Sequence, residues 1–379
     1  MSENRLQVAI HDLNQQGGQD RSTLEILIRL RKKIPLTIHA FSVSEPALLS
    51  SSRLVRPNIR RPVLLKAIYF YLRLFLRGGG LWHATGVSHL RSRVVHLQFI
   101  HKAWRAKRTQ RENSGFLRGL YQEFFELFNI ALENLCFREG KTYIAISDSV
   151  ARDLREQFGI EKNIHVVRHG VDPNLFRPLS GNEKANSPVR TRLGIGPGEK
   201  MALFVGSYER KGLETLVRAL ALLSPEIRKD FKLVAVGDGN QAYYSQLAES
   251  LGVQKHLLLV SKEKNIVPYF QAADLFVFPT LYEPFGLVIL EAMACGLPAI
   301  VSRAAGGAEL IREGESGLLI ENPRDEKEVA RKISSTLQSP GKLSEMAKSA
   351  RSVAEARSWD RVAEEYEAVL TTLVSRPGH

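Results

Sequence analysis

The sequence predicts an α/β protein of two doubly wound domains, in which two parallel sheets covered by helices face a cleft. Two observations predict this class. Short apolar runs alternate with segments of helical period in both halves of the chain, and a stretch without periodicity, residues 173–198, separates the halves. That stretch is rich in Pro, Gly, Asn and Ser, as linkers are. A chain of 379 residues, 44% of them hydrophobic, can also form two cores.

The second half shows the alternation most regularly. Its predicted strands are residues 201–206, 232–237, 256–260, 274–280 and 297–302, and the helices that follow them are residues 213–223, 241–251, 266–273, 287–294 and 306–312. The strands are apolar on both faces, which is typical of a parallel sheet covered by helices. Ligands bind beyond the carboxyl ends of such strands, so we look for chemistry in the loops there.

The first half repeats the pattern more loosely. Its predicted strands are residues 6–10, 36–41, 93–99 and 142–147, and its predicted helices are residues 21–31 and 150–158. Three helical segments end the chain, at residues 326–337, 343–357 and 360–374. We therefore expect domains at 1–175 and 176–357, followed by a terminal helical segment at 358–379.

Composition excludes several classes of protein. The two cysteines, Cys136 and Cys295, are too few for a disulfide framework or a Cys-rich zinc site, and they fit a reducing compartment. The N-terminus shows no cleavable signal, so we expect a cytoplasmic protein. The most lipid-like stretch, residues 63–76, has 14 residues and contains Lys66 and Arg73, whereas a spanning helix needs about 20 apolar residues.

The net charge of +13 comes from one segment. Residues 50–118 contain 15 Lys or Arg and a single acid, Glu112, and so carry +14, which leaves 38 bases and 39 acids elsewhere. The residues expected at an anionic membrane surface are Arg60, Arg61, Lys66, Arg73, Arg77, Lys102, Trp104, Arg105, Lys107, Arg108 and Arg111. Each engaged cation contributes on the order of 1 kcal/mol, so four to six give roughly 4 to 6 kcal/mol. The alternatives are a solvated or oligomer-forming face, or nucleic acid, for which no recognition module is visible.

The sharpest local motif holds two glutamates, Glu283 and Glu291, eight positions apart. If most of this span is helical, the carboxylates lie about 12 Å apart. That is too far for the carboxylate pair of a glycosidase, which needs about 5 to 9.5 Å. It suits two groups that hold an extended ligand, with backbone N–H groups around residues 285–288 facing an anion between them. A nucleotide sugar has this layout. Alternatively, the two acids are a helix-start residue and a solvated residue.

Two further loops follow predicted strands. Arg210 and Lys211 would place positive charge beside a diphosphate, or belong to an ordinary surface loop. Gly17 and Gly18 would let the backbone approach a ligand, or form an ordinary turn. Residues 237–239 lack the third glycine of a dinucleotide fingerprint, so NAD binding is discounted.

Together these pieces resemble the retaining glycosyltransferases of the GT-B fold, family 4 (glycosyl transferases group 1), and within it the lipopolysaccharide core glucosyltransferases. The motifs that carry the resemblance are VGSYERKG, VAVGDG, VPYFQAADLFVFPTLYEPFGLVILEAMACGLPAIVS, GGAELIREGESGLLI, Ser358-Trp359, YIAISDSVARDL, ALENLCFREGK and His169-Gly-Val-Asp172. The resemblance implies an acceptor-binding first domain, a nucleotide-sugar-binding second domain, and a terminal helix that packs back on the first.

The resemblance also implies residue roles. Glu283 contacts the transferred sugar, Glu291 contacts the donor ribose, and Arg210 with Lys211 binds the diphosphate. The other donor-side positions are Gly17, Gly18, Phe285, Gly286, Leu287 and Val288 and, beside the base, Val260, Ser261 and Lys262. Many members have an arginine directly after the phosphate-loop glycine. This chain has Ser207 there, so the phosphate charge rests on Arg210 and Lys211.

Retaining members of this fold react on one face of the sugar, and the leaving phosphate assists deprotonation of the acceptor, so catalysis depends on positioning and on stabilising the departing charge. The resemblance implies no metal and no cofactor besides the donor. Of His96 and His101, we favour His101 as the histidine that touches the sugar, because it follows its strand; either could instead be a core or surface histidine.

The predicted function is hexosyl transfer, with glucose from UDP-glucose favoured, to a glycolipid or lipopolysaccharide-core acceptor at the inner face of the cytoplasmic membrane. The alternatives are a GDP-mannose-dependent enzyme and a non-catalytic glycan- or membrane-binding protein on the same scaffold.

Overall fold

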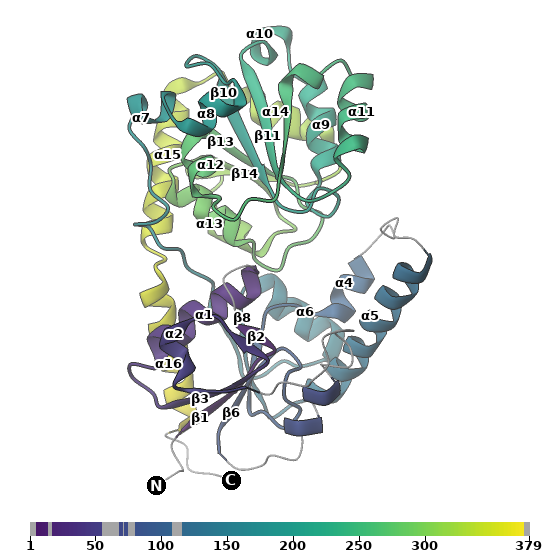
Figure 1. Ribbon diagram of the computed structural model, residues 1–379, viewed down its shortest axis with the longest axis vertical. Helices are drawn as coiled ribbons and strands as arrows, with labels where there is room; N and C mark the ends of the chain where they lie inside the picture. Colours follow the sequence, from purple (N-terminus) through teal and green to yellow (C-terminus); the bar gives the residue numbers. More distant parts are fainter. Residues whose placement is uncertain are drawn as a thin grey trace. The chain divides into compact units, whose positions relative to one another are not determined.

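The computed structural model describes residues 5–13, 17–54, 68–70, 72–74, 80–107 and 116–374. The chain forms two compact units (Figure 1): an N-terminal unit of Met1–His169 with Trp359–His379, and a C-terminal unit of Gly170–Ser358. The chain therefore passes between the units at 169/170 and 358/359, whereas the boundaries predicted from the sequence are 175/176 and 357/358.

The N-terminal unit is built on a seven-stranded sheet in which every pair of neighbouring strands is parallel. The strands, in pairing order, are β5 (Ser52–Leu54), β3 (Leu36–Ala40), β1 (Leu6–Ala9), β6 (Trp82–Thr85), β7 (Val94–Leu97), β8 (Thr142–Ala145) and β9 (Ile164–Val166). The short strands β2 (Asp12–Leu13) and β4 (Ser42–Val43) form a separate parallel pair. The parallel α/β class and all four predicted strands of this half are confirmed.

Strand β6 lies at the centre of this sheet, between β1 and β7, but its sequence did not predict it. It carries His83, a polar residue, at a buried position. Nε2 of the His83 ring hydrogen-bonds to the hydroxyl of Tyr366 on the terminal helix, so a residue distant in sequence provides a partner for one of its two nitrogens. A central strand can therefore contain a buried polar residue, although such a residue breaks the apolar pattern by which a strand is predicted from sequence.

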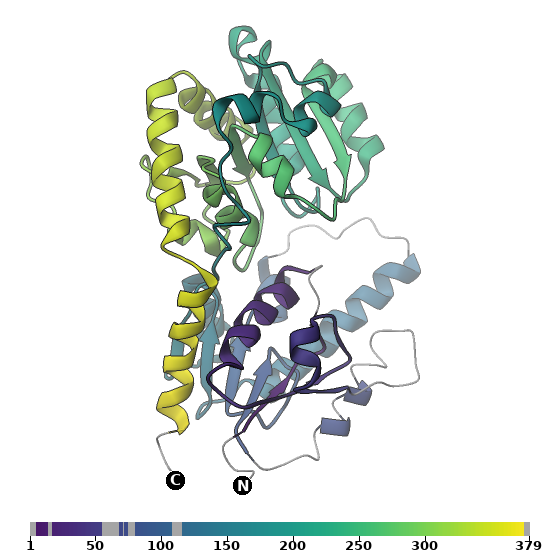
Figure 2. The same cartoon turned by 60° about the vertical axis from the view of Figure 1, so that its left-hand side comes forward.

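Helices flank this sheet. They are α1 (Gly18–Leu30), α2 (Pro46–Leu49), α4 (His101–Lys107), α5 (Phe116–Cys136), α6 (Asp148–Phe158) and α16 (Trp359–Val374). Ser147 caps the start of α6 through the Val150 N–H, and Gly159 ends it with φ +66°. The last helix, α16, lies against α1 (Figure 2), where Arg29 pairs with Asp360 at 2.6 Å. The prediction that the terminal helix packs on the first domain is confirmed.

The C-terminal unit contains a six-stranded parallel sheet. Its strands, in pairing order, are β12 (Leu257–Ser261), β11 (Phe231–Gly237), β10 (Lys200–Val205), β13 (Leu275–Phe278), β14 (Ala299–Ser302) and β15 (Gly317–Ile320). Its helices are α7 (Gly181–Ala185), α8 (Pro188–Leu193), α9 (Leu213–Leu222), α10 (Pro225–Arg228), α11 (Gln241–Ser250), α12 (Val267–Ala272), α13 (Leu287–Ala294), α14 (Glu326–Leu337) and α15 (Pro340–Glu355), with 3-10 turns η1 (Gln254–His256) and η2 (Gly306–Leu310). All five predicted strands of this half are confirmed.

Several details of the C-terminal unit differ from the sequence prediction, which lacked strand β15 and helix α10. The predicted helix at 306–312 is the 3-10 turn η2. The predicted irregular linker contains helices α7 and α8, because Ser187 caps α8 through the Arg190 N–H and Pro188 occupies its first turn. These helices are only five and six residues long, too short to show a helical period.

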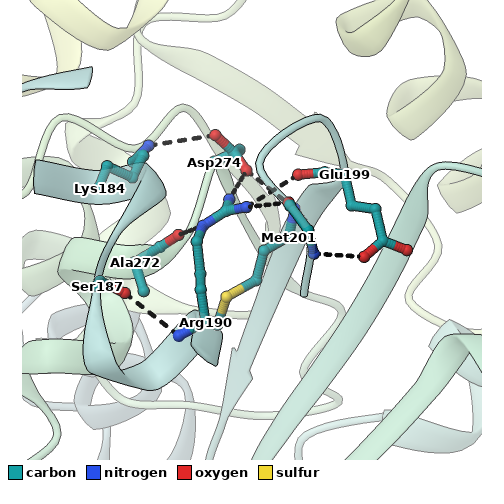
Figure 3. Close-up of polar contacts among 8 residues, drawn as sticks. Lys184, Ser187, Arg190, Glu199, Met201, Ala272 and Asp274 are labelled. Carbon is teal, nitrogen blue, oxygen red and sulfur yellow. Dashed lines mark hydrogen bonds and ion pairs between the residues drawn. The ribbon is translucent and has the colours of Figure 1, made fainter. Parts of the chain in front are cut away.

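A buried arginine ties α8 to the sheet (Figure 3). The Arg190 guanidinium donates to the carbonyl oxygens of Ala272 at 2.9 Å and Glu199 at 3.0 Å, and pairs with Asp274 at 2.5 Å. The same Asp274 carboxylate accepts the Met201 N–H at 2.9 Å. These residues lie at the amino ends of β10 and β13, so the linker helices are anchored on the edge opposite the strands' carboxyl ends.

Candidate functional site

The predicted donor-side residues of the C-terminal unit gather at one edge of its sheet. Because all six strands are parallel, the loops after β10, β11, β12, β13 and β14 meet at their carboxyl ends. These loops contain, in order, residues 206–212, 238–240, 262–266, 279–286 and 303–305. Arg210, Lys211 and Glu283 lie in two neighbouring loops, since β10 pairs directly with β13.

The loop after β10 has a backbone that only glycine permits at one key point. Gly212 has φ +79°, and a Cβ there would lie 2.1 Å from the Pro279 carbonyl oxygen, well inside contact distance. Buried Tyr208 links the same loop to β11 and β12, since its hydroxyl donates to the carbonyls of Ala235 and Val260 at 3.2 and 3.1 Å. The loop is thus held against β13, β11 and β12, and this fixes the path of its two cations.

Lys211 pairs with Glu283 through its ammonium group. The Lys211 side chain is only 6% exposed, and its ammonium lies 5.5 Å from the centre of the Phe278 ring. Burial lowers the pKa of Lys211 well below its usual range, and the neighbouring Arg210 adds to this effect. The Glu283 carboxylate acts in the opposite direction, because an opposite charge favours the protonated lysine.

The backbone around Glu283 is hydrogen-bonded to the residues that follow β14. The Glu283 N–H donates to the Ala304 carbonyl at 3.2 Å, and the Glu283 carbonyl accepts the Gly306 N–H at 2.8 Å. The next hydrogen bond runs from the Gly307 N–H to the Phe285 carbonyl at 2.7 Å, where a Cβ on Gly307 would also lie 2.7 Å from that oxygen. The main chain that carries the Glu283 side chain is therefore fixed from outside.

Helix α13 begins directly after this loop. Gly286, with φ +88°, precedes it, and Leu287 and Val288 are its first two residues, whose N–H groups have no acceptor within the helix. Glu291, in the second turn, is buried. Only residues 287–294 are helical, so the estimate of 12 Å between the two glutamates, which assumed helix over most of their span, does not describe residues 283–286.

The predicted base-side residues lie at the same edge. Val260 and Ser261 end strand β12, and Lys262 follows it; Val260 is half-buried and the other two are exposed. The hydroxyl of Tyr208 links the loop after β10 to this strand through the Val260 carbonyl. The structure thus brings the predicted diphosphate, sugar and base residues of the C-terminal unit to one sheet edge.

In the N-terminal unit, the predicted residues also follow strands. Gly17 caps α1 and Gly18 is its first residue, after β1 and β2. His101 begins α4 after β7, and its Nδ1 lies 3.0 Å from the Glu133 carboxylate. His96, in contrast, is buried within β7. Burial lowers the pKa of His96 far below its usual range, so it remains a neutral core histidine at neutral pH.

The predicted membrane residues lie only partly within the described chain. Arg60, Arg61, Lys66, Arg77, Arg108 and Arg111 lie outside it. Arg73 is exposed and donates to the Tyr69 hydroxyl, and Trp104 is half-buried. The cations of α4 pair within the unit: Lys102 donates to the Gln157 carbonyl at 2.6 Å, Arg105 pairs with Glu123 at 2.5 Å, and Lys107 pairs with Asp153.

Helix α5, beside α4 in Figure 1, shows a feature that sequence analysis missed. Its outer face is apolar: Leu120, Phe124, Leu127 and Leu135 are 53, 58, 48 and 51% exposed. Its inner face mixes polar and apolar residues, with Glu126, Asn129 and Glu133 buried beside Leu132 and Cys136. The helical spacing of the outer apolar residues was visible in the sequence, but Phe125, Leu132 and Cys136 place apolar residues on the opposite face as well. Periodicity alone therefore could not show which face points outward.

Two doubly wound parallel-sheet units, with a terminal helix returning to the first, are the architecture of GT-B glycosyltransferases. Residues 16–175 match the family Glycosyltransferase Family 4, and residues 187–353 match Glycosyl transferases group 1. The chain belongs to this family of retaining hexosyltransferases. The interpretation of the sequence as an enzyme is confirmed.

Curated relatives are 30 to 33% identical to this chain over the stretches that match. A glycosyltransferase of Methanocaldococcus jannaschii is 33% identical over 282 residues, which cover 72% of this chain and 68% of that protein. Spore coat protein SA of Bacillus subtilis is 30% identical over 74% of this chain and 79% of its own length. The D-inositol 3-phosphate glycosyltransferase of Rhodococcus jostii is 31% identical, but the match spans only 51% of that protein and 60% of this chain.

Solved structures share the fold at lower identity. WaaG, a glycosyltransferase involved in lipopolysaccharide biosynthesis, has a TM-score of 0.75 at 20% identity, over 95% of this chain and 98% of WaaG. Anabaena HepE, solved in complex with UDP-glucose, has a TM-score of 0.70 at 20% identity, over 99% of this chain and all of HepE.

No set of three or more His, Cys, Asp or Glu side chains in the part of the chain that the structure describes is arranged to hold a metal ion. Of the helices in the described ranges, none combines the length and apolarity needed to cross a bilayer.

Proposed function

We propose that this enzyme transfers a hexose from a nucleoside diphosphate donor to a membrane-associated glycolipid or lipopolysaccharide-core acceptor, with glucose from UDP-glucose the first candidate and mannose from GDP-mannose the second. The observation that carries the proposal is the pairing of Lys211 with Glu283 beside the start of α13. At the carboxyl ends of the strands, this pair places a positive charge and a carboxylate beside the first N–H groups of α13, which have no acceptor within the helix. A diphosphate binds such cations and N–H groups, and a sugar hydroxyl binds a carboxylate.

In this proposal the donor lies along the carboxyl edge of the C-terminal sheet. Arg210, Lys211 and the first N–H groups of α13 bind the diphosphate, Glu283 binds the sugar, and Glu291 binds the ribose. The acceptor hydroxyl attacks the anomeric carbon on the face that the diphosphate leaves, the bond to the phosphate oxygen breaks, and the hydroxyl proton passes to the diphosphate. The protein residues contribute position and fixed charge, which stabilise the departing anion.

UDP-glucose is the first candidate because the resemblance in sequence is to glucosyltransferases and because HepE, which shares the fold, binds that donor. The experiment is a screen of UDP- and GDP-hexoses with the full chain, in which nucleoside diphosphate release is measured without acceptor and the anomeric configuration of the product is measured with one. We expect release from UDP-glucose above all others. Release only from GDP-mannose would replace the donor, and release from no nucleotide sugar would contradict the proposal.

The proposed acceptor surface is the apolar face of α5 together with the basic segment 50–118. An amphipathic helix beside cations is attracted to anionic bilayers by both apolar burial and charge. The α4 cations pair inward, so the apolar contribution of α5 has a larger share in this proposal than the sequence suggested. Flotation with anionic and with neutral vesicles tests it: we expect binding to the anionic vesicles that weakens in high salt, and equal recovery with both would contradict it.

A further inference from the structure

We propose that Lys211 and Glu283 form an exchangeable ion pair, in which Glu283 is the counter-ion of Lys211 until a nucleoside diphosphate takes its place. The carboxylate is then released toward the sugar only after the diphosphate has bound. This inference rests on the proposed function and adds an order of events to it.

Two residues with different proposed roles contact each other. The diphosphate and the sugar are different parts of the donor, yet the lysine assigned to the former and the glutamate assigned to the latter are joined in one ion pair. Lys211 cannot give its full charge to a phosphate while a carboxylate occupies it. Opening the ion pair would release the full charge of Lys211 to the phosphate and the Glu283 carboxylate to the sugar hydroxyl.

Lys211 requires a counter-charge whether or not a donor is present. The Lys211 side chain is 6% exposed and lies against the Phe278 ring, and a buried ammonium without a counter-charge is strongly unfavourable. The pKa of Lys211 is already lowered by burial and by Arg210. Glu283 stabilises the charged lysine in the free enzyme, and a diphosphate would do so in the complex.

Glu283 is the member of the ion pair that an incoming anion can replace. Its side chain is 18% exposed, against 6% for the lysine, so solvent and an incoming anion reach the pair from the Glu283 side. The main chains of both residues are fixed, Lys211 by the loop that Gly212 packs against Pro279, and Glu283 by its hydrogen bonds to Ala304 and Gly306. Exchange therefore needs only side-chain rotation.

The experiment is calorimetric titration of the full chain with UDP and with GDP at pH about 6, comparing wild type, Glu283→Gln, Lys211→Met and the double variant. If the carboxylate competes with the nucleotide, Glu283→Gln tightens nucleoside diphosphate binding by about tenfold, equivalent to about 1.4 kcal/mol. Lys211→Met weakens binding by about tenfold or more. In the Lys211→Met background, the gain from Glu283→Gln is lost, because the two residues compete through one contact.

A matched control separates exchange from general repulsion between negative charges. Glu209 lies in the same loop, is exposed and accepts the Asn240 N–H, so Glu209→Gln removes the same charge without touching Lys211. We expect it to change the affinity for UDP and GDP by less than about twofold. Thermal unfolding of each variant confirms that it is folded.

Several outcomes would overturn the inference. If Glu283→Gln weakens binding or leaves it unchanged, Glu283 holds Lys211 in place in the complex and the pair does not exchange. If the gain persists in the Lys211→Met background or appears equally in Glu209→Gln, it reflects repulsion alone. A wild-type chain that binds neither nucleotide overturns the proposed donor class itself, and that result differs from both of the others.

Discussion

The C-terminal unit carries its candidate site on loops that the backbone fixes, whereas the N-terminal unit carries its candidate membrane surface on the face of one helix. In the former, side chains such as Lys211 and Glu283 leave loops that are hydrogen-bonded to their neighbours. In the latter, α5 turns glutamates inward to the α4 cations and leaves apolar residues outside. A donor site needs side chains held in fixed positions, whereas a membrane-binding surface needs only a face of suitable chemistry. Four experiments test this difference between the units.

The largest effect is expected at the fixed loop. Glu283→Ala removes both the proposed sugar contact and the counter-ion of Lys211, so we expect the rate of hexosyl transfer to fall by about a thousandfold or more. The measurement is kcat with saturating donor. Glu249→Ala, at an exposed position of α11, is the matched control and should retain the wild-type rate. Full turnover in Glu283→Ala would remove this residue from the site.

The second effect concerns the stability of the same edge. Gly212→Ala would place a Cβ against the Pro279 carbonyl in a left-handed conformation, so we expect a loss of about 3 kcal/mol in the free energy of unfolding. Gly194→Ala is the control, because Gly194 has φ +65° but open space around its Cα. It should cost only the conformational term, about 1 kcal/mol. Equal losses in urea unfolding would show that the close approach to β13 is relaxed in solution.

The third effect is a loss of stability at low pH that we expect to be larger in the N-terminal unit than in the C-terminal unit. Burial lowers the pKa of His83 from 6.5 to about 4, so the unfolded chain takes up a proton below pH 6.5 that the folded chain refuses until about pH 4. Stability therefore falls as the pH drops, by about 2 kcal/mol at pH 5 for His83 alone. The C-terminal unit has one histidine, His256, and lacks tryptophan, whereas Trp82, Trp104 and Trp359 all belong to the N-terminal unit.

Tryptophan fluorescence in urea therefore reports the N-terminal unit, and hydrogen exchange in β10 and β11 reports the C-terminal unit. We expect the fluorescence transition to move to lower urea between pH 7 and pH 5 and the exchange protection to change less. Parallel changes in both would mean that the buried histidines do not set the acid sensitivity.

The smallest effect is expected on the helix face. Replacing Leu120, Phe124 and Leu127 together by Gln removes the apolar stripe of α5, and we expect about tenfold weaker binding to anionic vesicles with hexosyl transfer to a soluble acceptor unchanged. Leu222→Gln, at a 50% exposed position of α9 in the other unit, is the control. If the triple variant binds vesicles as well as wild type, the apolar face of α5 has another occupant.

The strands that could be predicted most clearly from the sequence are those in which nearly every residue is apolar. Uniformly apolar strands such as those at 232–237 and 274–280 leave no alternative to a buried parallel sheet, and the order of loops follows from the chain itself. Sequence analysis failed at β6, where His83 obtains its partner from α16, and at α7 and α8, which are too short to show a period. It also could not foresee that Lys211 and Glu283 form a pair, because 72 residues separate them.

The two-domain α/β class, the family and the strand-end positions of the candidate donor residues can be predicted from the sequence, because each depends on patterns within short stretches. Long-range packing sets which face of α5 is exposed, which cations of α4 are neutralised and which acid pairs with Lys211. Those outcomes depend on contacts between residues far apart in the chain. A buried charge must pair with a group that tertiary packing brings beside it, and the local sequence pattern does not show which group that is.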